Sequence, residues 1–337
     1  MRWTRTEELI VRDDDGVGHP LATYSALEGM PVPSQRRFLA SPDGRRLVFA
    51  EKGGDGLVIR AADGASRRIG LTGLLDFRFV NAATLAVSSH TRQVTVAVDR
   101  GEVTPVAQVP NVTWMEACPE GMVLRHRRGS TNCVSLVRHD GTTHRLAEAE
   151  QLTRVMAAPT SRRVAYCESH RLVILDLDGG PRRAWDLGKT HAWPRNGEIS
   201  ADGSTVAIAG DHALLVSRDG RAPRPLWVEP GINAVWLRGD ELLAASHRKV
   251  LLARGRAKVT MPGVGRIATV RFARRGTGVI VARDREVLAW TPGQAPTRLA
   301  AVGAPRHVLG AQRWDGGLAI WTGRRVKVPE EAHPIFD

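Results

Sequence analysis

The sequence contains no long apolar run. Its longest runs, such as Leu47–Ala50 and Leu172–Leu175, each end after four residues at an acidic residue, whereas a membrane-spanning helix needs about 20. The first residues, MRWTRTEELIVRDDDG, reach acidic side chains before any apolar block forms, so the pattern of an export signal is missing. We therefore expect a chain that spans no membrane and works in the cytoplasm.

Cysteine is scarce, and paired metal ligands are missing. Cys118, Cys133 and Cys167 form an odd set without a CxxC pair, which favours reduced, buried thiols over a disulfide framework. Together with His126, His139 and His144, two of these cysteines could converge on zinc, but structural zinc ligands usually come in pairs two to four residues apart. The candidates Cys118, His126, Cys133, His139 and His144 are five to eight residues apart. We expect no metal site and no cofactor.

The common catalytic sequence motifs are also missing. The sequence contains no HExxH, GxSxG or GxxxxGK[ST] motif, and Ser246–Lys249, which spells SxxK, falls on an expected hairpin rather than on a helix. The acidic phrases RDDDG and LDLDGG read more simply as hairpin turns than as calcium loops, because Asp-Gly is a favoured turn pair. We assign no catalytic residue and expect no enzyme.

Lysine is rare, so arginine carries almost all of the formal net charge of +13. From Ile232 to the end there are 18 Arg or Lys against 8 Asp or Glu, a net charge of +10, whereas residues 1–231 carry +3. Arginine, alanine and glycine are typical of a GC-rich genome, and part of the excess can reflect that bias. A concentrated positive charge nevertheless attracts phosphates or an acidic protein.

One sequence motif recurs along the chain. FLASPDGRRLVFA at Phe38–Ala50 is nearly copied by EISADGSTVAIAG at Glu198–Gly210. A second, glycine-terminated phrase recurs in every unit, and its spacings are 37, 40, 38, 41, 35 and 38 residues; it ends at Gly64, Gly101, Gly141, Gly179, Gly220, Gly255 and Gly293. A period in this range marks solenoids, propellers or arrays.

Each unit of about 38 residues reads as four short strands. A first run, such as Phe38–Ser41, leads through a turn to a second, nearly all-apolar run such as Leu47–Ala50, then to the glycine-terminated run and a weaker fourth such as Arg67–Ile69. Asp-Gly turns between Val-, Ile- and Leu-rich runs are hairpin signals. Middle strands that are apolar on both faces must be covered on both faces, and a ring of stacked four-stranded sheets does this.

These residues resemble the β-propeller repeat superfamily. SPDGRRLVFA and LVILDLDGG are similar to the repeats of Tol-associated propellers, whereas EVLAWTPG at Glu286–Gly293 and GLAIWTG at Gly317–Gly323 are similar to WD-repeat endings with threonine in place of aspartate. The Gly-His dipeptide of strict WD repeats is missing from the expected places. The resemblance covers nearly the whole chain and implies an all-β protein with one propeller domain, residues 1–337.

We expect eight blades of four antiparallel strands, with seven as the alternative. Adding 38 residues to the seventh unit predicts an eighth that uses HVLGA, GLAIW and RVKV as its first three strands. Residues 1–33 would then supply its closing strand, from either Glu8–Gly16 or Pro20–Leu27, while residues 34–337 hold the repeats. Pairing of the two ends would tie down termini that otherwise fray.

Tryptophan supplies nine of the few aromatic residues. We expect Trp185, Trp227, Trp290 and Trp321 to fill the wedges between blades, since large aromatic side chains bury the most apolar surface. The loop HAWPRNG, with His191, Trp193 and Arg195, is a candidate contact loop, because exposed tryptophan beside arginine is a favoured composition for interaction hot spots.

The best functional signal is a basic arc on the last three blades. Successive blades lie side by side, so their charges are expected to form one positive surface for a partner. Its members are Arg248, Lys249, Arg254, Arg256, Lys258, Arg266, Arg274, Arg275, Arg324 and Arg325. An arginine-biased, solvated surface partly paired with Asp240, Asp284 and Glu286 is the alternative.

We predict a non-catalytic scaffold for protein–protein interaction, a monomeric propeller that acts within a larger assembly and recognises an acidic partner. One alternative is sequence-independent binding of nucleic acid through the basic arc, which would weaken steeply with salt. A second alternative is a hydrolase or lyase with a site in the central channel, because such a site is assembled from separate blades and need not appear as a local motif.

Overall fold

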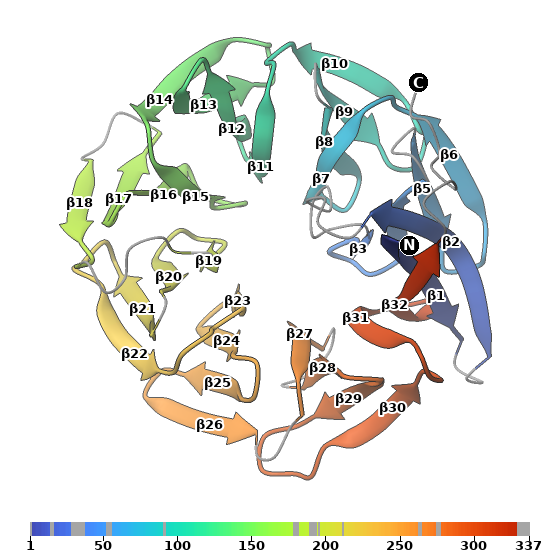
Figure 1. The fold of residues 1–337 in the computed structure, drawn as a ribbon. Coiled ribbons are helices and arrows are strands. Elements are labelled where there is room, and N and C mark those ends of the chain that lie inside the picture. The colour runs from blue at the N-terminus through green and yellow to red at the C-terminus, as the bar shows by residue number, and fades with distance from the viewer. Residues whose placement is uncertain are drawn as a thin grey trace.

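The computed structural model describes residues 2–13, 17–27, 38–51, 56–89, 92–177, 182–188, 194, 196–210, 212–261, 265–273 and 278–328. Within these ranges every regular element is a β-strand, and the 32 strands form eight four-stranded sheets. The sheets stand side by side around one axis, as the blades of a propeller (Figure 1). The expected all-β, eight-bladed ring is confirmed, and the seven-bladed alternative is wrong.

Within a blade the strands run antiparallel and follow the chain outward from the ring axis (Figure 1). The first blade holds β3 (Phe38–Ala40), β4 (Arg46–Ala50), β5 (Gly56–Ala61) and β6 (Ser66–Gly70). The second holds β7 (Leu74–Asn81), β8 (Thr84–Ser89), β9 (Gln93–Ala97) and β10 (Val103–Ala107). The third holds β11 (Val112–Cys118), β12 (Gly121–Arg128), β13 (Thr131–Arg138) and β14 (Thr143–Ala149).

The next four blades repeat this order. The fourth holds β15 (Leu152–Ala157), β16 (Arg163–Glu168), β17 (Arg171–Asp176) and β18 (Arg183–Asp186). The fifth holds β19 (Asn196–Ile199), β20 (Thr205–Ala209), β21 (Ala213–Arg218) and β22 (Arg224–Val228). The sixth holds β23 (Ala234–Arg238), β24 (Glu241–Ala245), β25 (Val250–Arg254) and β26 (Ala257–Met261). The seventh holds β27 (Ile267–Phe272), β28 (Val279–Arg283), β29 (Glu286–Trp290) and β30 (Thr297–Ala301).

The eighth blade joins the two ends of the chain. Its strand order is β31 (His307–Trp314), β32 (Gly317–Val328), β1 (Arg2–Arg12) and β2 (Gly18–Leu27). The N-terminal segment therefore closes the ring as expected, but it supplies two strands rather than one. GLAIW and RVKV were expected as separate strands; they form one 12-residue strand, β32. Because β32 continues without a turn, the third and fourth positions are left for β1 and β2.

The two copied phrases form the same turn. In the first blade Ser41 Oγ donates to Asp43 Oδ1 at 2.6 Å, and the amide of Arg45 donates to the same oxygen at 3.1 Å. In the fifth, Ser200 and the amide of Ser204 hold Asp202 at 2.6 and 3.0 Å. The glycines that follow, Gly44 and Gly203, have φ of 68° and 73°, a conformation that glycine adopts without strain. The repeat thus encodes one hairpin between the first two strands of a blade.

The core lies between neighbouring blades rather than in one central volume. Leu243 and Leu252 of the sixth blade pack with Val270, Val281 and Trp290 of the seventh. The tryptophans expected between blades are found there. Trp290 and Trp321 are buried, and Trp185 and Trp227 are partly buried and pack against the apolar clusters between neighbouring blades. All three cysteines are free and buried, and burial raises the pKa of the Cys118 and Cys167 thiols to about 12.

We predict that ring closure depends on the apolar face of β1. Leu9 is 1% exposed, is paired with Ala22 and Trp321, and packs in the cluster that joins the eighth and first blades. Leu9→Ala should lower the free energy of unfolding by about 2–5 kcal/mol, because it leaves a cavity there. Denaturant unfolding measures the loss, with Val228→Ala, at a 77% exposed position, as the control. Equal midpoints for the two variants would contradict this account of closure.

Candidate functional site

The strand order gives the ring two chemically different ends. Turns between first and second strands, and between third and fourth strands, lie at one end; turns between second and third strands, and the connections to the next blade, lie at the other. We call the first the acidic end, because most of its turns carry a carboxylate: Asp43, Asp63, Asp99, Glu102, Glu120, Asp140, Asp202, Asp219, Asp240 and Asp315. Arg45, Arg100, Arg162, Arg221 and Arg256 lie among them.

The carboxylates of the acidic end are held as hydrogen-bond acceptors. Bonds from the Ser41, Thr142 and Ser200 hydroxyls lower the pKa of Asp43, Asp140 and Asp202 respectively. A hydrogen bond to the charged form of a carboxylate stabilises that form. These aspartates therefore keep their negative charge while they shape the turns.

The opposite end, which we call the basic end, presents arginine and lysine side chains in its described turns and strand ends. It is defined by Arg92, Arg128, Arg248, Lys249, Arg266 and Arg285. Lys249 Nζ pairs with Glu229 at 2.8 Å, but none of the five arginines forms an ion pair with another residue in the described ranges. Glu150, Asp186 and Asp284 are exposed acids at this end, and Glu51 is a partly buried one. The arginines thus present charge that the described chain does not neutralise.

The predicted basic arc is divided between the two ends of the ring. Arg248 and Lys249 precede β25, whereas Arg254 and Arg256 lie at its other end. Five residues of strand separate them by about 15 Å. Arg266 lies at the basic end, while Lys258 lies on the outermost strand β26 and donates to the Leu226 carbonyl at 2.9 Å. The topology brings Arg248, Lys249 and Arg266 together and sets Arg254 and Arg256 apart from them. A role of the arc residues in partner binding stays a prediction.

Several candidate residues fall outside what the structure describes. The contact loop with His191, Trp193 and Arg195, and the arc residues Arg274 and Arg275, are outside the described residues. Arg324 is exposed on β32, in the half of the strand nearer the basic end, and the side chain of Arg325 is not described.

The innermost strands carry a network of charged and aromatic side chains. Arg78 on β7 is buried and meets Asp76 at 3.3 Å and Glu116, on β11 of the next blade, at 3.2 Å. Trp114 Nε1 donates to Glu116 at 3.0 Å, and the Arg154 guanidinium lies 4.3 Å from the Trp114 ring centroid. Arg154 in turn donates to the Gly197 carbonyl at 2.8 Å. The network links the inner strands of four successive blades, from the second to the fifth.

A second inner cluster connects the sixth and seventh blades. The Arg271 guanidinium stacks 3.6 Å from the Trp236 centroid, and that of Arg238 lies 4.3 Å from the Phe272 centroid. Arg238 also pairs with Glu241 at 2.7 Å. A cation at these distances over an aromatic face is attracted to the ring. These inner charged groups are therefore engaged in blade-to-blade contacts.

The cysteines and histidines that were considered as zinc ligands are spread through the third blade. His126 Nε2 lies 3.0 Å from Ser135 Oγ, and His139 Nε2 lies 3.0 Å from the Pro119 carbonyl. Burial and then the charge of Arg128 lower the pKa of His126. Among the described residues no group of three or more histidines, cysteines or carboxylates is placed to hold a metal.

A pocket with a volume of about 360 Å³ lies at the basic end, between the third and fourth blades. It is lined by Thr113, Arg125, Arg127, Asn132, Glu150, Gln151 and Leu152. β12 and β13 have eight residues each, whereas β16 and β17 of the fourth blade have six. The longer hairpin raises one wall of the pocket, and the connection at Glu150–Leu152 forms the other.

Strand alternation places the two pocket arginines. Val123, Arg125 and Arg127 share one face of β12, since every second residue of a strand points to the same side. Val123 packs in the core between the third and fourth blades, Arg125 is half-buried and Arg127 is exposed. This face therefore changes from apolar to basic as the strand leaves the core.

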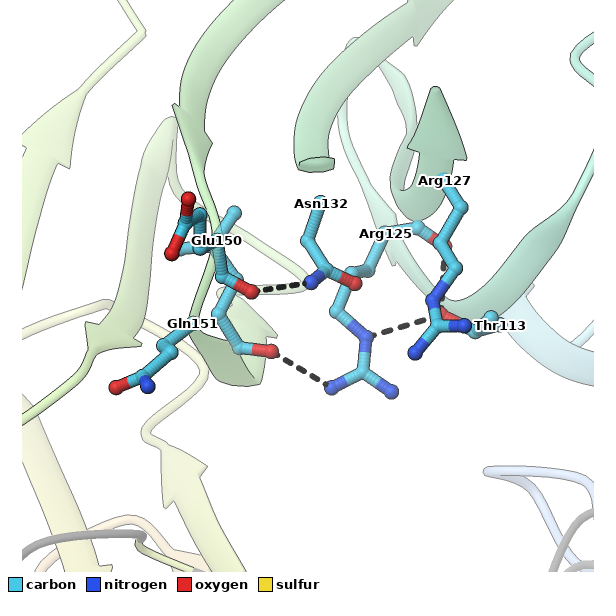
Figure 2. Close-up of a pocket in the computed structure, with 7 residues that line it drawn as sticks. Thr113, Arg125, Arg127, Asn132, Glu150 and Gln151 are labelled. Carbon is cyan, nitrogen blue, oxygen red and sulfur yellow. Dashed lines mark hydrogen bonds between the residues drawn. The ribbon is translucent and has the colours of Figure 1, made fainter. Parts of the chain in front are cut away.

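Arg125 is fixed by its neighbours (Figure 2). Its Nε donates to Thr113 Oγ1 at 3.0 Å, and its Nη1 donates to the carbonyls of Leu152, at 3.2 Å, and Thr153. Burial and then the charge of Arg127 lower the pKa of Arg125, although an arginine keeps its proton in proteins. Two like charges thus share one recess.

Arg125 and Arg127 were not among the residues predicted from the sequence. A signal was present: the segment LRHRRGSTNCVSLV continues strand alternation through three arginines before its Gly-Ser turn, so its hairpin is longer than its neighbours. Which blade face these arginines occupy follows only once the register is known.

Comparison with known proteins supports the fold. No protein-family model and no curated protein sequence matches the chain. Among solved structures, one titled as a eukaryotic initiation factor has a TM-score of 0.54 at 11% identity, covering 89% of this chain and 85% of that one. A chain of the mitotic checkpoint complex has a TM-score of 0.54 at 13% identity, covering 89% and 96%. Kluyveromyces lactis Hsv2 has 0.52 at 9% identity, covering 87% and 98%.

The fold is that of a β-propeller. These similarities extend over most of each chain, so the propeller resemblance inferred from the repeats is confirmed at the level of fold. Identities this low say nothing about activity, and fold alone does not determine function. In the described residues no helix is long and apolar enough to span a bilayer.

We predict that the inner network stabilises the ring. Glu116→Ala should lower the free energy of unfolding by about 3–5 kcal/mol, because it leaves the buried Arg78 with one carboxylate fewer. Arg254→Ala breaks the exposed pair with Asp240 and should cost less than about 1 kcal/mol. Denaturant unfolding of both variants measures the difference, and equal losses would show that the inner pair contributes no more than a surface one.

Proposed function

We propose that this propeller is a cytoplasmic, non-catalytic scaffold that binds an acidic protein partner through its basic end. The observation that carries the proposal is the set of exposed arginines at that end, Arg92, Arg128, Arg248, Arg266 and Arg285, which no described carboxylate neutralises. Uncompensated surface charge of one sign steers oppositely charged partners toward it. The pocket between the third and fourth blades opens on the same end.

Two further observations support a binding role. The charged groups of the innermost strands are engaged with one another across blades, as in the bond between Arg78 and Glu116, which assigns them to holding the ring together. A propeller with similar backbone geometry comes from the mitotic checkpoint complex, so this architecture can serve within an assembly. We infer that the present chain also works as one component of a complex.

Binding of nucleic acid is the second candidate, because the same arginines could contact phosphates. A nucleic-acid contact made through several phosphates would weaken steeply with salt as counterions are released. The acidic end disfavours it in part, since a long polyanion that wrapped the ring would meet the carboxylates of the Asp-Gly turns.

The test is capture of partners from native extract by the tagged protein, with and without nuclease, followed by mass spectrometry. We expect a defined set of proteins that survives nuclease, and we expect Arg248→Glu with Arg266→Glu to reduce it at least about tenfold, because charge reversal repels an acidic partner. Arg256→Glu, in the same blade but at the acidic end, is the control and should leave capture unchanged.

The proposal is wrong if the retained material is nucleic acid and the proteins disappear on digestion. It is also wrong if Arg256→Glu abolishes capture as strongly as the pair at the basic end, because the charge of the whole protein, rather than that of one end, would then explain the binding.

A further inference from the structure

The pocket between the third and fourth blades has two arginines in its lining. Arg125 and Arg127 both line it, and neither forms an ion pair with a carboxylate in the described part of the chain. Glu150, the nearest acidic side chain along the lining, lies beyond Asn132 and its carboxylate is directed away from Arg125 (Figure 2). A carboxylate that entered the pocket would be the missing partner of two cations.

The contacts of Arg125 leave a defined donor for that ligand. Nε and Nη1 are occupied by Thr113 Oγ1 and by backbone carbonyls, so the hydrogens of Nη2 are the ones available for a ligand. Because those contacts hold the guanidinium in place, little rotamer freedom is lost when it binds. Arg127 is exposed and offers a complete fork, which matches a carboxylate with two parallel hydrogen bonds.

The rest of the lining favours a peptide over a polyphosphate. Thr113, Asn132 and Gln151 are neutral hydrogen-bonding side chains, Leu152 is apolar, and the exposed Glu150 adds a negative charge to the rim. A nucleic-acid backbone consists of phosphates and sugars and has no amide groups to pair with these neutral side chains. A peptide combines a carboxylate for the arginines with amide donors and apolar atoms for the remaining lining.

We propose that the recess lined by Arg125, Arg127 and Asn132 binds an acidic peptide segment of the partner, with a glutamate or aspartate carboxylate seated between the two guanidinium groups. The inference rests on the proposed function and adds to it the position and the chemistry of the contact. The basic end then supplies long-range attraction, and this pocket supplies the specific contact.

Fluorescence anisotropy with a fluorescein-labelled hexaglutamate peptide tests the proposal on the full chain. We expect saturable binding that Arg127→Gln weakens about tenfold, as expected for loss of a charge-assisted hydrogen bond. Arg125→Lys, which keeps the charge but loses the fork, should weaken it as well.

The control is Arg221→Gln. Arg221 is also exposed, lies at the acidic end between β21 and β22, and does not line the pocket. Its substitution removes the same charge from outside the basic end and should change the affinity less than about twofold, since exposed charges interact weakly through water. Circular dichroism confirms that each variant is folded.

Equal weakening by the Arg127 and Arg221 substitutions would overturn the proposal, because binding would then follow net charge alone. Binding that inorganic phosphate displaces at lower concentration than acetate would overturn the assignment of a carboxylate. So would saturable binding of a single-stranded oligonucleotide that Arg127→Gln weakens more than it weakens hexaglutamate binding.

This outcome is separable from that of the proposed function. If extract proteins are still captured through Arg248 and Arg266 while Arg127→Gln leaves the affinity for hexaglutamate unchanged, the scaffold proposal stands and the pocket assignment fails. If hexaglutamate binds through Arg127 but no protein survives nuclease treatment in the capture experiment, the pocket stands and the scaffold fails.

Discussion

The structure depends on one constraint: the middle strands of each blade are apolar on both faces, so each sheet must be covered on both sides. Val48 and Leu57 of the first blade, like Leu243 and Val250 of the sixth, are fully buried between neighbouring sheets. A ring satisfies this condition for every sheet, but only if it closes. Closure therefore requires β1 to pair with β32 along eleven residues, which makes the two ends of the chain part of one blade.

The ring also fixes where charge is displayed. Antiparallel strands of regular length send alternate turns to opposite ends, so a repeat that spells Asp-Gly in two of its turns places its carboxylates at one end. The remaining turns and the connections between blades are free to vary, and here they hold arginine. Because one hairpin, β12–β13, is longer than its neighbours, Arg127 reaches past the core and, with Arg125, lines a recess at the basic end. Fold, polarity and pocket thus follow from the same repeat.

Much of the fold could be predicted from the sequence, because strand alternation, Asp-Gly turns and a period near 38 residues are local signals. That the N-terminal segment closes the ring was predicted, but its supply of two strands instead of one was not, since the length of β32 depends on its pairing with β1. The basic arc was assigned by blade, which ignores the end of the strand at which a residue lies; Arg248 and Arg256 therefore appeared adjacent although β25 separates them. The pocket could not be predicted either, because its position depends on the strand register and on the contact between two blades, which no local sequence pattern encodes.

The most direct test of the central claim is hydrogen–deuterium exchange of the protein with and without the captured partner. The account predicts slower exchange in residues 125–132 and 246–250, which belong to the basic end, and unchanged exchange in the turns 41–45 and 200–204 of the acidic end. Bound backbone amides lose access to solvent and exchange more slowly. Protection of the acidic turns, with no change at residues 125–132, would contradict it.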